Sequence, residues 1–335
     1  MMNMDKTLGE LLTDPLIAKI APDAIRNMDL SKEPMWEKSL AQLRQEHFGG
    51  DLAAGFEALF RQARTGDWYY PLYSQAECLE DPNRSGANLV WLPSDADDAS
   101  SRPFLLLVPG GGFVNVWNLT EGWPIAARFN RLGYHVFILS YQVSGGNRLL
   151  DREMGDFAQA LHLIQARADH FAVDPSRYLT CGFSAGGYLV CLWNVHEKGY
   201  AFHGLPKPQA CFPVYPLTSW KQYIEDRQKS GDSSWENEYA DGAFFGCDLR
   251  TAANSAFEVP DHAEGFPPCA LFLTETDGLV NPEHSRRLER ALKQLGLPCR
   301  MEIGASGGHG FADGSDMCMA GWIDRAVQWF ESLES

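Results

Sequence analysis

The chain has 335 residues, a formal net charge of −16 at pH 7 and 45% hydrophobic residues. This length fits one large α/β domain with an extension, and the apolar content is sufficient for a sizeable core. The negative charge disfavours binding to nucleic acid or to an anionic membrane surface, because both require clustered lysine and arginine side chains. A neutral substrate fits this charge best.

The first ten residues lack the basic start and apolar stretch of a secretion signal, and no later segment resembles a membrane span. Eight cysteines are spread along the chain without a Cys-x-x-Cys pair. Several of them fall inside apolar runs, so they are interpreted as reduced core residues. These features predict a cytoplasmic protein.

Residues 1–66 carry apolar residues at helical spacing, as at Leu8, Leu11 and Leu12. This pattern predicts an N-terminal helical extension, interpreted either as a cap over a site or as the face of a homodimer. After the extension, strand-like and helix-like segments alternate through residues 67–335. Such alternation predicts a mostly parallel central sheet with helices on both faces.

The expected strands are short apolar runs, and the expected helices are the longer periodic stretches between them. The strands cover residues 87–92, 104–109, 135–140, 177–181, 210–215, 269–275 and 299–303. The helices cover residues 121–132, 151–170, 185–197, 282–295 and 316–333. Their order predicts right-handed crossovers between parallel strands.

A glycine-rich loop, Pro109-Gly110-Gly111-Gly112-Phe113, directly follows the expected strand 104–109. Successive glycines let the backbone pass close to a substrate carbonyl with its amides turned inward. We interpret the Gly111 and Gly112 amides as donors to an oxyanion. A phosphate-binding loop is the competing interpretation, but neither Gly-x-Gly-x-x-Gly nor Gly-Lys-Ser/Thr is present.

The run Gly182-Phe183-Ser184-Ala185-Gly186 lies between an expected strand and an expected helix. Gly-x-Ser-x-Gly in this context displays a nucleophilic serine on a sharp turn, and glycines on either side allow neighbouring backbone to pack closely. Ser184 is therefore the candidate nucleophile, and the amide of Ala185 is the third expected oxyanion donor. An ordinary glycine turn is the alternative.

Residues 218–267 interrupt the alternation with a polar, aromatic stretch between two strands, including Trp220, Trp235 and Tyr239. We interpret this stretch as an inserted lid or pocket wall, because long connections in compact domains often serve a site. A surface insertion without function is the alternative.

A serine nucleophile needs a histidine base and an acid that orients this base. His309 is the candidate base, because it follows the last expected strand in the flexible run Gly307-Gly308-His309-Gly310-Phe311. Asp277 is the candidate acid, because it follows the penultimate strand. Two other carboxyl groups compete with it: Glu275 would still lie on the strand, and Asp313 is close to His309 in sequence.

With these residues in place, the chain from about residue 70 to 335 resembles the α/β-hydrolases of the hormone-sensitive-lipase-like group, and more narrowly the bacterial acetyl esterase and carbohydrate esterase branch. The chain order Ser184, Asp277, His309 is the order in that fold. The resemblance implies an α/β-hydrolase fold, with the extension and the lid-like insertion added to it. Pro109 replaces the histidine that usually precedes the three glycines, and the extension has no counterpart in the family.

Four aromatic residues near strand ends, in the glycine loop or in the insertion are the expected substrate-binding residues: Phe113, Trp117, Tyr215 and Trp220. Ligands of α/β sheets bind at this edge, and aromatic rings suit sugars or aromatic acyl groups. Core packing is the alternative for each of them.

The function expected from these residues and from the resemblance is hydrolysis of short-chain, acetyl-type esters, including those of acetylated carbohydrates, through an acyl-enzyme on Ser184. This chemistry requires no metal and no organic cofactor. A feruloyl-type esterase and an amide hydrolase, such as a peptidase or an arylformamidase, are alternatives on the same triad. A binding protein that keeps the fold without turnover is a third.

Overall fold

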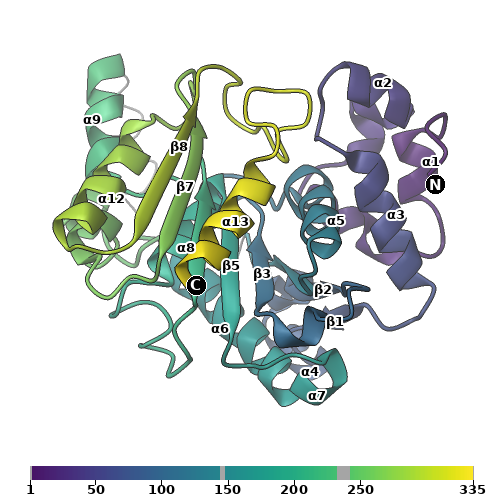
Figure 1. Cartoon of the computed structure of the whole chain (residues 1–335), viewed down its shortest axis with the longest axis horizontal. Coiled ribbons are helices and arrows are strands. Elements are labelled where there is room, and N and C mark those ends of the chain that lie inside the picture. Colours follow the sequence, from purple (N-terminus) through teal and green to yellow (C-terminus); the bar gives the residue numbers. More distant parts are fainter. Residues whose placement is uncertain (1, 144–147, 232–241, 335) are drawn as a thin grey trace.

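The computed structural model describes residues 2–143, 148–231 and 242–334. Within these residues the strands form an eight-stranded sheet in the order β1-β2-β4-β3-β5-β6-β7-β8 (Figure 1). The pairs β1–β2 and β2–β4 are antiparallel, and all other neighbours are parallel. The strands are β1 Tyr69–Pro71, β2 Asn88–Leu92, β3 Phe104–Val108, β4 Val136–Ser140, β5 Tyr178–Phe183, β6 Ala210–Val214, β7 Cys269–Thr274 and β8 Cys299–Gly304.

Helices lie on both faces of this sheet, as the alternation predicts. The α-helices are α1 Leu8–Leu12, α2 Leu40–Gln45, α3 Leu52–Ala63, α4 Gln75–Glu80, α5 Trp123–Arg131, α6 Leu149–Ala166, α7 Ala168–Phe171, α8 Ser184–Leu192, α9 Trp220–Ser230, α11 Leu249–Ala252, α12 Glu283–Gln294 and α13 Trp322–Glu334. A single-turn π-helix, η6, covers Asn118–Gly122.

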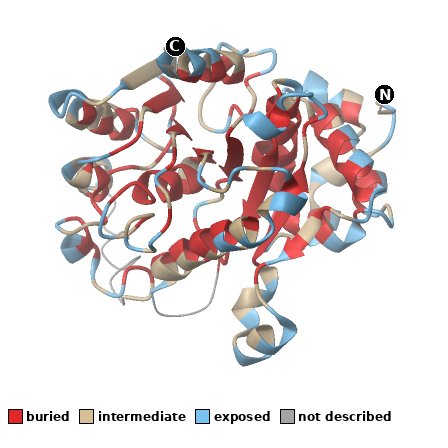
Figure 2. Cartoon of the chain, turned by 60° about the horizontal axis from the view of Figure 1, so that its bottom comes forward, coloured by how far each residue is buried: buried red, intermediate tan, exposed pale blue. Residues whose placement is uncertain are grey.

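Successive residues of the central strands serve two separate cores, because side chains alternate across a sheet. In β3, Phe104 and Leu106 pack into the cluster that holds α6, α8 and α12, whereas Leu105 and Leu107 pack into the cluster that holds α3, α5 and α13. Figure 2 shows the buried residues concentrated in these strands and on the inner sides of the helices. The central strands are thus buried on both faces. Because they are parallel, the segments that follow them all lie at the carboxyl-terminal edge of the sheet.

Residues 2–66 contain α1–α3 and short 3-10 helices joined by turns, and they pack beside α5 (Figure 1). The ring centroids of Phe56 in α3 and Trp123 in α5 lie 5.5 Å apart. The buried side chains of the extension, such as Leu8 and Leu59, belong to the same hydrophobic cluster as Leu105 in the sheet. The extension therefore shares a core with the sheet.

The observed elements differ from the expected ones mainly at their ends. The edge strand β1 was not predicted, because it has only three residues and contains no apolar run. The helix expected over 316–333 begins at Trp322, because Gly314 and Gly321, with φ angles of 72° and 76°, keep the preceding segment in turns. None of the helices in the described residues is long and apolar enough to cross a membrane.

Candidate active site

Ser184 stands on a sharp turn between β5 and α8, with a φ angle of 50°. A non-glycine residue rarely adopts this left-handed conformation, so the surrounding packing has to hold the strained backbone. Glycines provide the space: a Cβ on Gly182 would lie 2.3 Å from the carbonyl oxygen of Gly186, and a Cβ on Gly186 would lie 2.2 Å from that of Val108. The small residues on either side of the serine are therefore required sterically, as the sequence predicts.

The structure brings the three predicted triad residues together. His309 Nε2 lies 2.9 Å from Ser184 Oγ, and His309 Nδ1 lies 2.7 Å from Asp277 Oδ2. With the Nδ1–H donating to the carboxylate, Nε2 accepts from the serine hydroxyl, which is the tautomer that a general base needs. The Asp277 side chain is almost completely buried, whereas the His309 ring remains partly open to solvent.

Backbone amides hold the Asp277 carboxylate in place. Its Oδ1 atom accepts hydrogen bonds from the amides of Leu279 and Val280, each at 2.9 Å, which leaves Oδ2 for the histidine. The two other candidates for the acid have different partners. Glu275 forms an ion pair with Arg286, and Asp313 accepts a hydrogen bond from the Asp51 amide.

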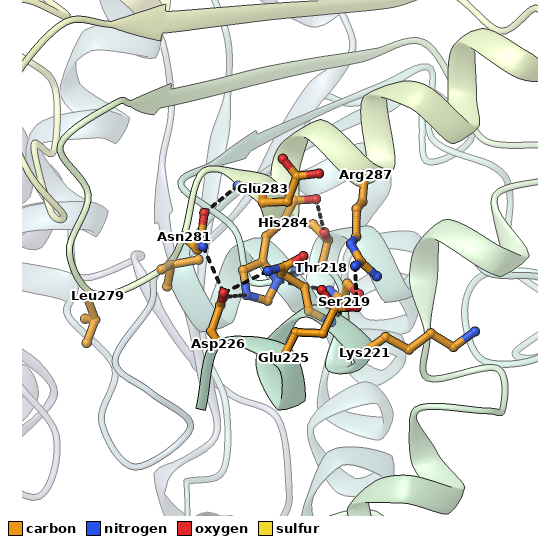
Figure 3. A network of polar contacts seen from close by, with 12 residues as sticks. Thr218, Ser219, Lys221, Glu225, Asp226, Leu279, Asn281, Glu283, His284 and Arg287 are labelled. Atoms are coloured by element: carbon orange, nitrogen blue, oxygen red, sulfur yellow. Dashed lines mark hydrogen bonds and ion pairs between the residues drawn. The ribbon is translucent and has the colours of Figure 1, made fainter. Parts of the chain in front are cut away.

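A polar network anchors the segment after Asp277 to α9 (Figure 3). Asn281 Nδ2 donates to Asp226 Oδ1 at 2.9 Å. The buried ring of His284 accepts at Nδ1 from the amides of Thr218 and Ser219, at 3.4 and 3.3 Å. The beginning of the insertion thus holds the segment that follows Asp277 in place.

The glycine loop carries amides suited to an oxyanion. Gly111 and Gly112 have φ angles of 134° and 64°, which other residues rarely adopt. Neither of these two amides donates a hydrogen bond to any other described residue. The amide of Ala185 belongs to the first turn of α8, where backbone N–H groups have no partner within the helix. All three predicted donors are therefore available.

Glu121 binds the glycine loop and lines the same cavity, and no sequence motif predicted this role. Its Oε2 accepts from the Gly110 amide and its Oε1 from the Tyr215 hydroxyl, both at 2.7 Å. Burial raises the pKa of Glu121, and the bonds from Tyr215 and Gly110 partly oppose this effect. Its position in η6, three residues before Pro124 of α5, carried no catalytic pattern.

A cavity of about 430 Å³ opens over these groups. Ser184, His309, Gly111 and Gly112 line it, and Trp117 and Leu279 form part of its wall. The remaining wall includes His47, Phe48 and Gly49, which come from the connection between α2 and α3. The extension, interpreted above as a cap over a site or as a dimer face, therefore contributes residues to the cavity wall.

Of the four aromatic residues expected to bind substrate, only Trp117 lines this cavity among the described residues. Phe113 and Trp220 are buried in an aromatic cluster, with ring centroids 6.4 Å apart. Tyr215 is buried beneath the histidine, with its ring centroid 4.6 Å from that of His309. For these three residues the structure agrees with the core-packing alternative.

The described residues of the insertion, 218–231 and 242–267, do not line the cavity either. They form α9, α11 and a 3-10 helix against α12 and the aromatic core. Trp235 and Tyr239, which the lid interpretation also used, lie outside the described residues.

Ser184 and His309 line the cavity together with Gly111 and Gly112, and Asp277 orients His309 from beside it. Such a nucleophile, base, acid and set of amides can perform acyl transfer: attack on a carbonyl, stabilisation of the oxyanion and protonation of the leaving group. Comparisons with known proteins point the same way. The BD-FAE family model matches residues 90–292, which include Ser184, Asp277 and the glycine loop.

Two curated relatives are similar over most of this chain. One is an endo-1,4-beta-xylanase B from Butyrivibrio fibrisolvens, 24% identical over 237 residues, which are 68% of this chain and 35% of that protein. The other is an acetylxylan esterase from Xylanibacter ruminicola, 25% identical over 210 residues, which are 62% of this chain and 41% of that protein. The chain thus spans well under half the length of both relatives.

Among solved structures, an acetyl ester-xyloside bifunctional hydrolase from Caldicellulosiruptor lactoaceticus has a TM-score of 0.63 and 25% identity to this chain. The match covers 79% of this chain and 96% of that one. Together with the sheet order and the helices on both faces, this match shows that the expected α/β-hydrolase fold is correct.

Proposed function

Because this chain belongs to the BD-FAE family, we propose that it is a serine carboxylesterase that hydrolyses short-chain, acetyl-type esters. The observation that carries the proposal is the chain of hydrogen bonds from Ser184 through His309 to Asp277, beside the Gly111 and Gly112 amides, which donate to no other residue in the described part of the chain. The names of the relatives, which include an acetylxylan esterase, support acetylated carbohydrates as the substrate class.

In the first half of the reaction, Ser184 Oγ attacks the ester carbonyl and His309 Nε2 takes its proton. The amides of Gly111, Gly112 and Ala185 stabilise the oxyanion; one such donor contributes roughly 10²–10³ in rate. Asp277 stabilises the imidazolium, which then protonates the leaving alcohol. This step breaks the bond between the carbonyl carbon and the alcohol oxygen and leaves the acyl group on Ser184.

In the second half, His309 takes a proton from water, and the resulting nucleophile attacks the acyl-enzyme. The same amides stabilise the second oxyanion. Collapse of this intermediate releases the carboxylic acid and returns the proton from His309 to Ser184. Each step uses groups that the chain itself supplies.

The proposed compartment is the cytoplasm. All eight cysteines lie within the described residues and are free, which supports a reducing environment. Measuring the free thiols of the protein isolated under alkylating conditions tests this point, and disulfide-bonded cysteines would contradict it.

The experiment is steady-state hydrolysis of p-nitrophenyl acetate, butyrate and octanoate, of an acetylated xylo-oligosaccharide and of a formanilide, with the native protein and with Ser184→Ala. We expect acetyl esters to be cleaved fastest and Ser184→Ala to be inactive, whereas Ser306→Ala, an exposed serine next to the histidine loop, keeps its activity. A fluorophosphonate probe should label the native protein but not Ser184→Ala. Faster cleavage of the formanilide would favour amide hydrolysis, and an inert Ser184 would refute the proposal.

A further inference from the structure

No catalytic step uses the part of the cavity wall that His47, Phe48 and Gly49 form. These residues lie between α2 and α3, outside the residues 90–292 that match the family model. His47 is exposed and Phe48 is partly buried, so both side chains can meet a ligand in the cavity. We define these three residues as the N-terminal wall.

The N-terminal wall is fixed to the histidine loop on one side. The Asp51 amide donates to Asp313 Oδ2 at 2.9 Å, and a Cβ on Gly50 would lie 2.4 Å from Asp313 Oδ1. Asp51 also caps α3, because its Oδ1 accepts from the Ala54 amide at 3.0 Å. The connection is therefore held directly against the loop that carries His309.

The wall is also fixed to the π-helix that carries Glu121. Gly49 has a φ angle of 74°, and a Cβ on it would lie 2.8 Å from Thr120 Cγ2. Contacts on both sides hold the wall at a defined place, so it can contribute to binding without a large ordering cost.

The geometry of the reaction assigns this side of the cavity to the alcohol. His309 Nε2 must reach the oxygen of the leaving group to protonate it, so the alcohol part of the ester lies on the histidine side of Ser184. The N-terminal wall is packed against the histidine loop, through Asp51 and Asp313. Substrate atoms that reach the wall therefore belong to the alcohol.

The chemistry of the wall fits a ring-shaped polyol. Phe48 and Trp117 contribute aromatic surface to the same cavity, and the C–H face of a pyranose packs well on such surface. The His47 side chain is exposed and lines the cavity, and its ring has no polar partner among the described residues, so its ring nitrogens are available to the hydroxyl groups at the edge of the sugar. The chain's net charge of −16 favours a neutral sugar over a uronic acid.

We propose that the N-terminal wall binds the leaving alcohol, a neutral pyranose, and sets the alcohol specificity of the enzyme. This inference rests on the proposed esterase function. It makes His47 and Phe48 specificity-determining residues that lie outside the family-matched region, and it gives the extension a role in recognition.

The test compares Phe48→Ala and His47→Ala with the native protein on two acetyl esters. One is an acetylated xylo-oligosaccharide, and the other is methyl acetate, whose alcohol is too small to reach the wall. We expect Phe48→Ala to raise KM for the oligosaccharide about tenfold, as loss of roughly 1.4 kcal/mol of aromatic contact implies. For methyl acetate, kcat/KM should stay within about twofold of the native value.

Two controls separate binding from structural damage. Phe202→Ala removes a ring that is 69% exposed and outside the cavity, so it should affect neither ester. The ratio of p-nitrophenyl acetate to butyrate hydrolysis should be the same in Phe48→Ala and in the native protein, because the acyl group lies away from the wall. A change in this ratio would assign the wall to the acyl group and overturn the inference.

Equal loss on both acetyl esters would show that the wall is only structural, and no change on either ester would show that it does not bind substrate. Both results overturn the inference while the esterase function stands, because native activity on methyl acetate remains. If the native protein cleaves no ester at all, the proposed function itself fails.

Discussion

The Oε2 atom of Glu121 accepts a hydrogen bond from the Gly110 amide at 2.7 Å. A buried carboxylate therefore holds the glycine loop at the residue just before the two expected oxyanion donors. The Tyr141 hydroxyl donates to the carbonyl of the preceding residue, Pro109, at 2.9 Å. Glu121 and Tyr141 thus hold the loop at two successive residues.

We expect Glu121→Gln to lower kcat for acetyl esters roughly tenfold with little change in KM, since it removes about 1.5 kcal/mol from a charge-assisted bond. Burial raises the pKa of Glu121, so in the native protein its protonation should weaken the loop and lower kcat as the pH falls, starting above its ordinary value of 4.5. In Glu121→Gln, the fall in kcat that protonation of Glu121 causes at low pH should be absent. The measurement is kcat against pH, with the exposed Glu264→Gln as the control; a native-like profile in Glu121→Gln would contradict this role.

Gly186→Ala should destabilise the protein and abolish activity. The added Cβ would lie 2.2 Å from the Val108 carbonyl oxygen, so β3 or the serine turn has to move. We expect the free energy of unfolding to fall by roughly 1–3 kcal/mol. Gly155→Ala is the matched control, because Gly155 lies within α6 with nothing within 4 Å of its Cβ position. This control should raise stability by roughly 0.5–1 kcal/mol, and denaturant unfolding measures both.

His284 should make the protein less stable in acid. Burial, with a smaller effect of Arg287, lowers the pKa of His284 from 6.5 to about 3, while Asp277 acts in the opposite direction. Below pH 6.5 the unfolded chain therefore binds a proton that the folded protein excludes, and stability falls as the pH is lowered toward 3. Between pH 6.5 and pH 5 the loss from this group is about 2 kcal/mol.

In His284→Asn this acid dependence should become flatter, because the amide oxygen can still accept from Thr218 and Ser219 but does not titrate (Figure 3). The measurement is the free energy of unfolding at several pH values. The exposed His196→Asn should keep the native slope. An unchanged slope in His284→Asn would show that another group is responsible.

The N-terminal extension should unfold together with the sheet. Arg26 is buried, pairs with Asp23 at 2.8 Å and donates to the Tyr141 carbonyl at 3.2 Å. Arg26→Met leaves the Asp23 charge buried without its partner, which costs about 3–5 kcal/mol. We expect a lower midpoint but one single transition, seen equally by tryptophan fluorescence and by circular dichroism. Two separate transitions in the native protein would mean that the extension is an independent unit.

The sequence predicted those parts of the fold and site that depend on local patterns. Strand β5, the serine turn and α8 follow each other within a short stretch, so the Gly-x-Ser-x-Gly context was sufficient to identify Ser184. Asp277 and His309 could be identified because each lies in the segment that follows a strand, and parallel strands bring such segments to one edge of the sheet.

The residues that were missed or misjudged depend on contacts between distant parts of the chain. Tyr215 follows β6 as a ligand-binding aromatic would, but its φ angle of 37° accompanies a buried ring beneath His309. Trp220 is buried because Phe244 and Phe245 cover it, with ring centroids 5.8 and 4.8 Å away. Neither the backbone conformation of Tyr215 nor the partners of Trp220 could be inferred from the pattern of apolar residues.

The hydrogen bond between the Asp51 amide and Asp313 joins residues 262 positions apart. During synthesis, the wall residues leave the ribosome long before the histidine loop exists, so the cavity cannot close until the segment up to Asp313 has been made. Such distant contacts form late, because they require closure of a very long loop. Growing chains that end before the histidine loop therefore carry an incomplete cavity, and the proposed binding of the alcohol requires both segments.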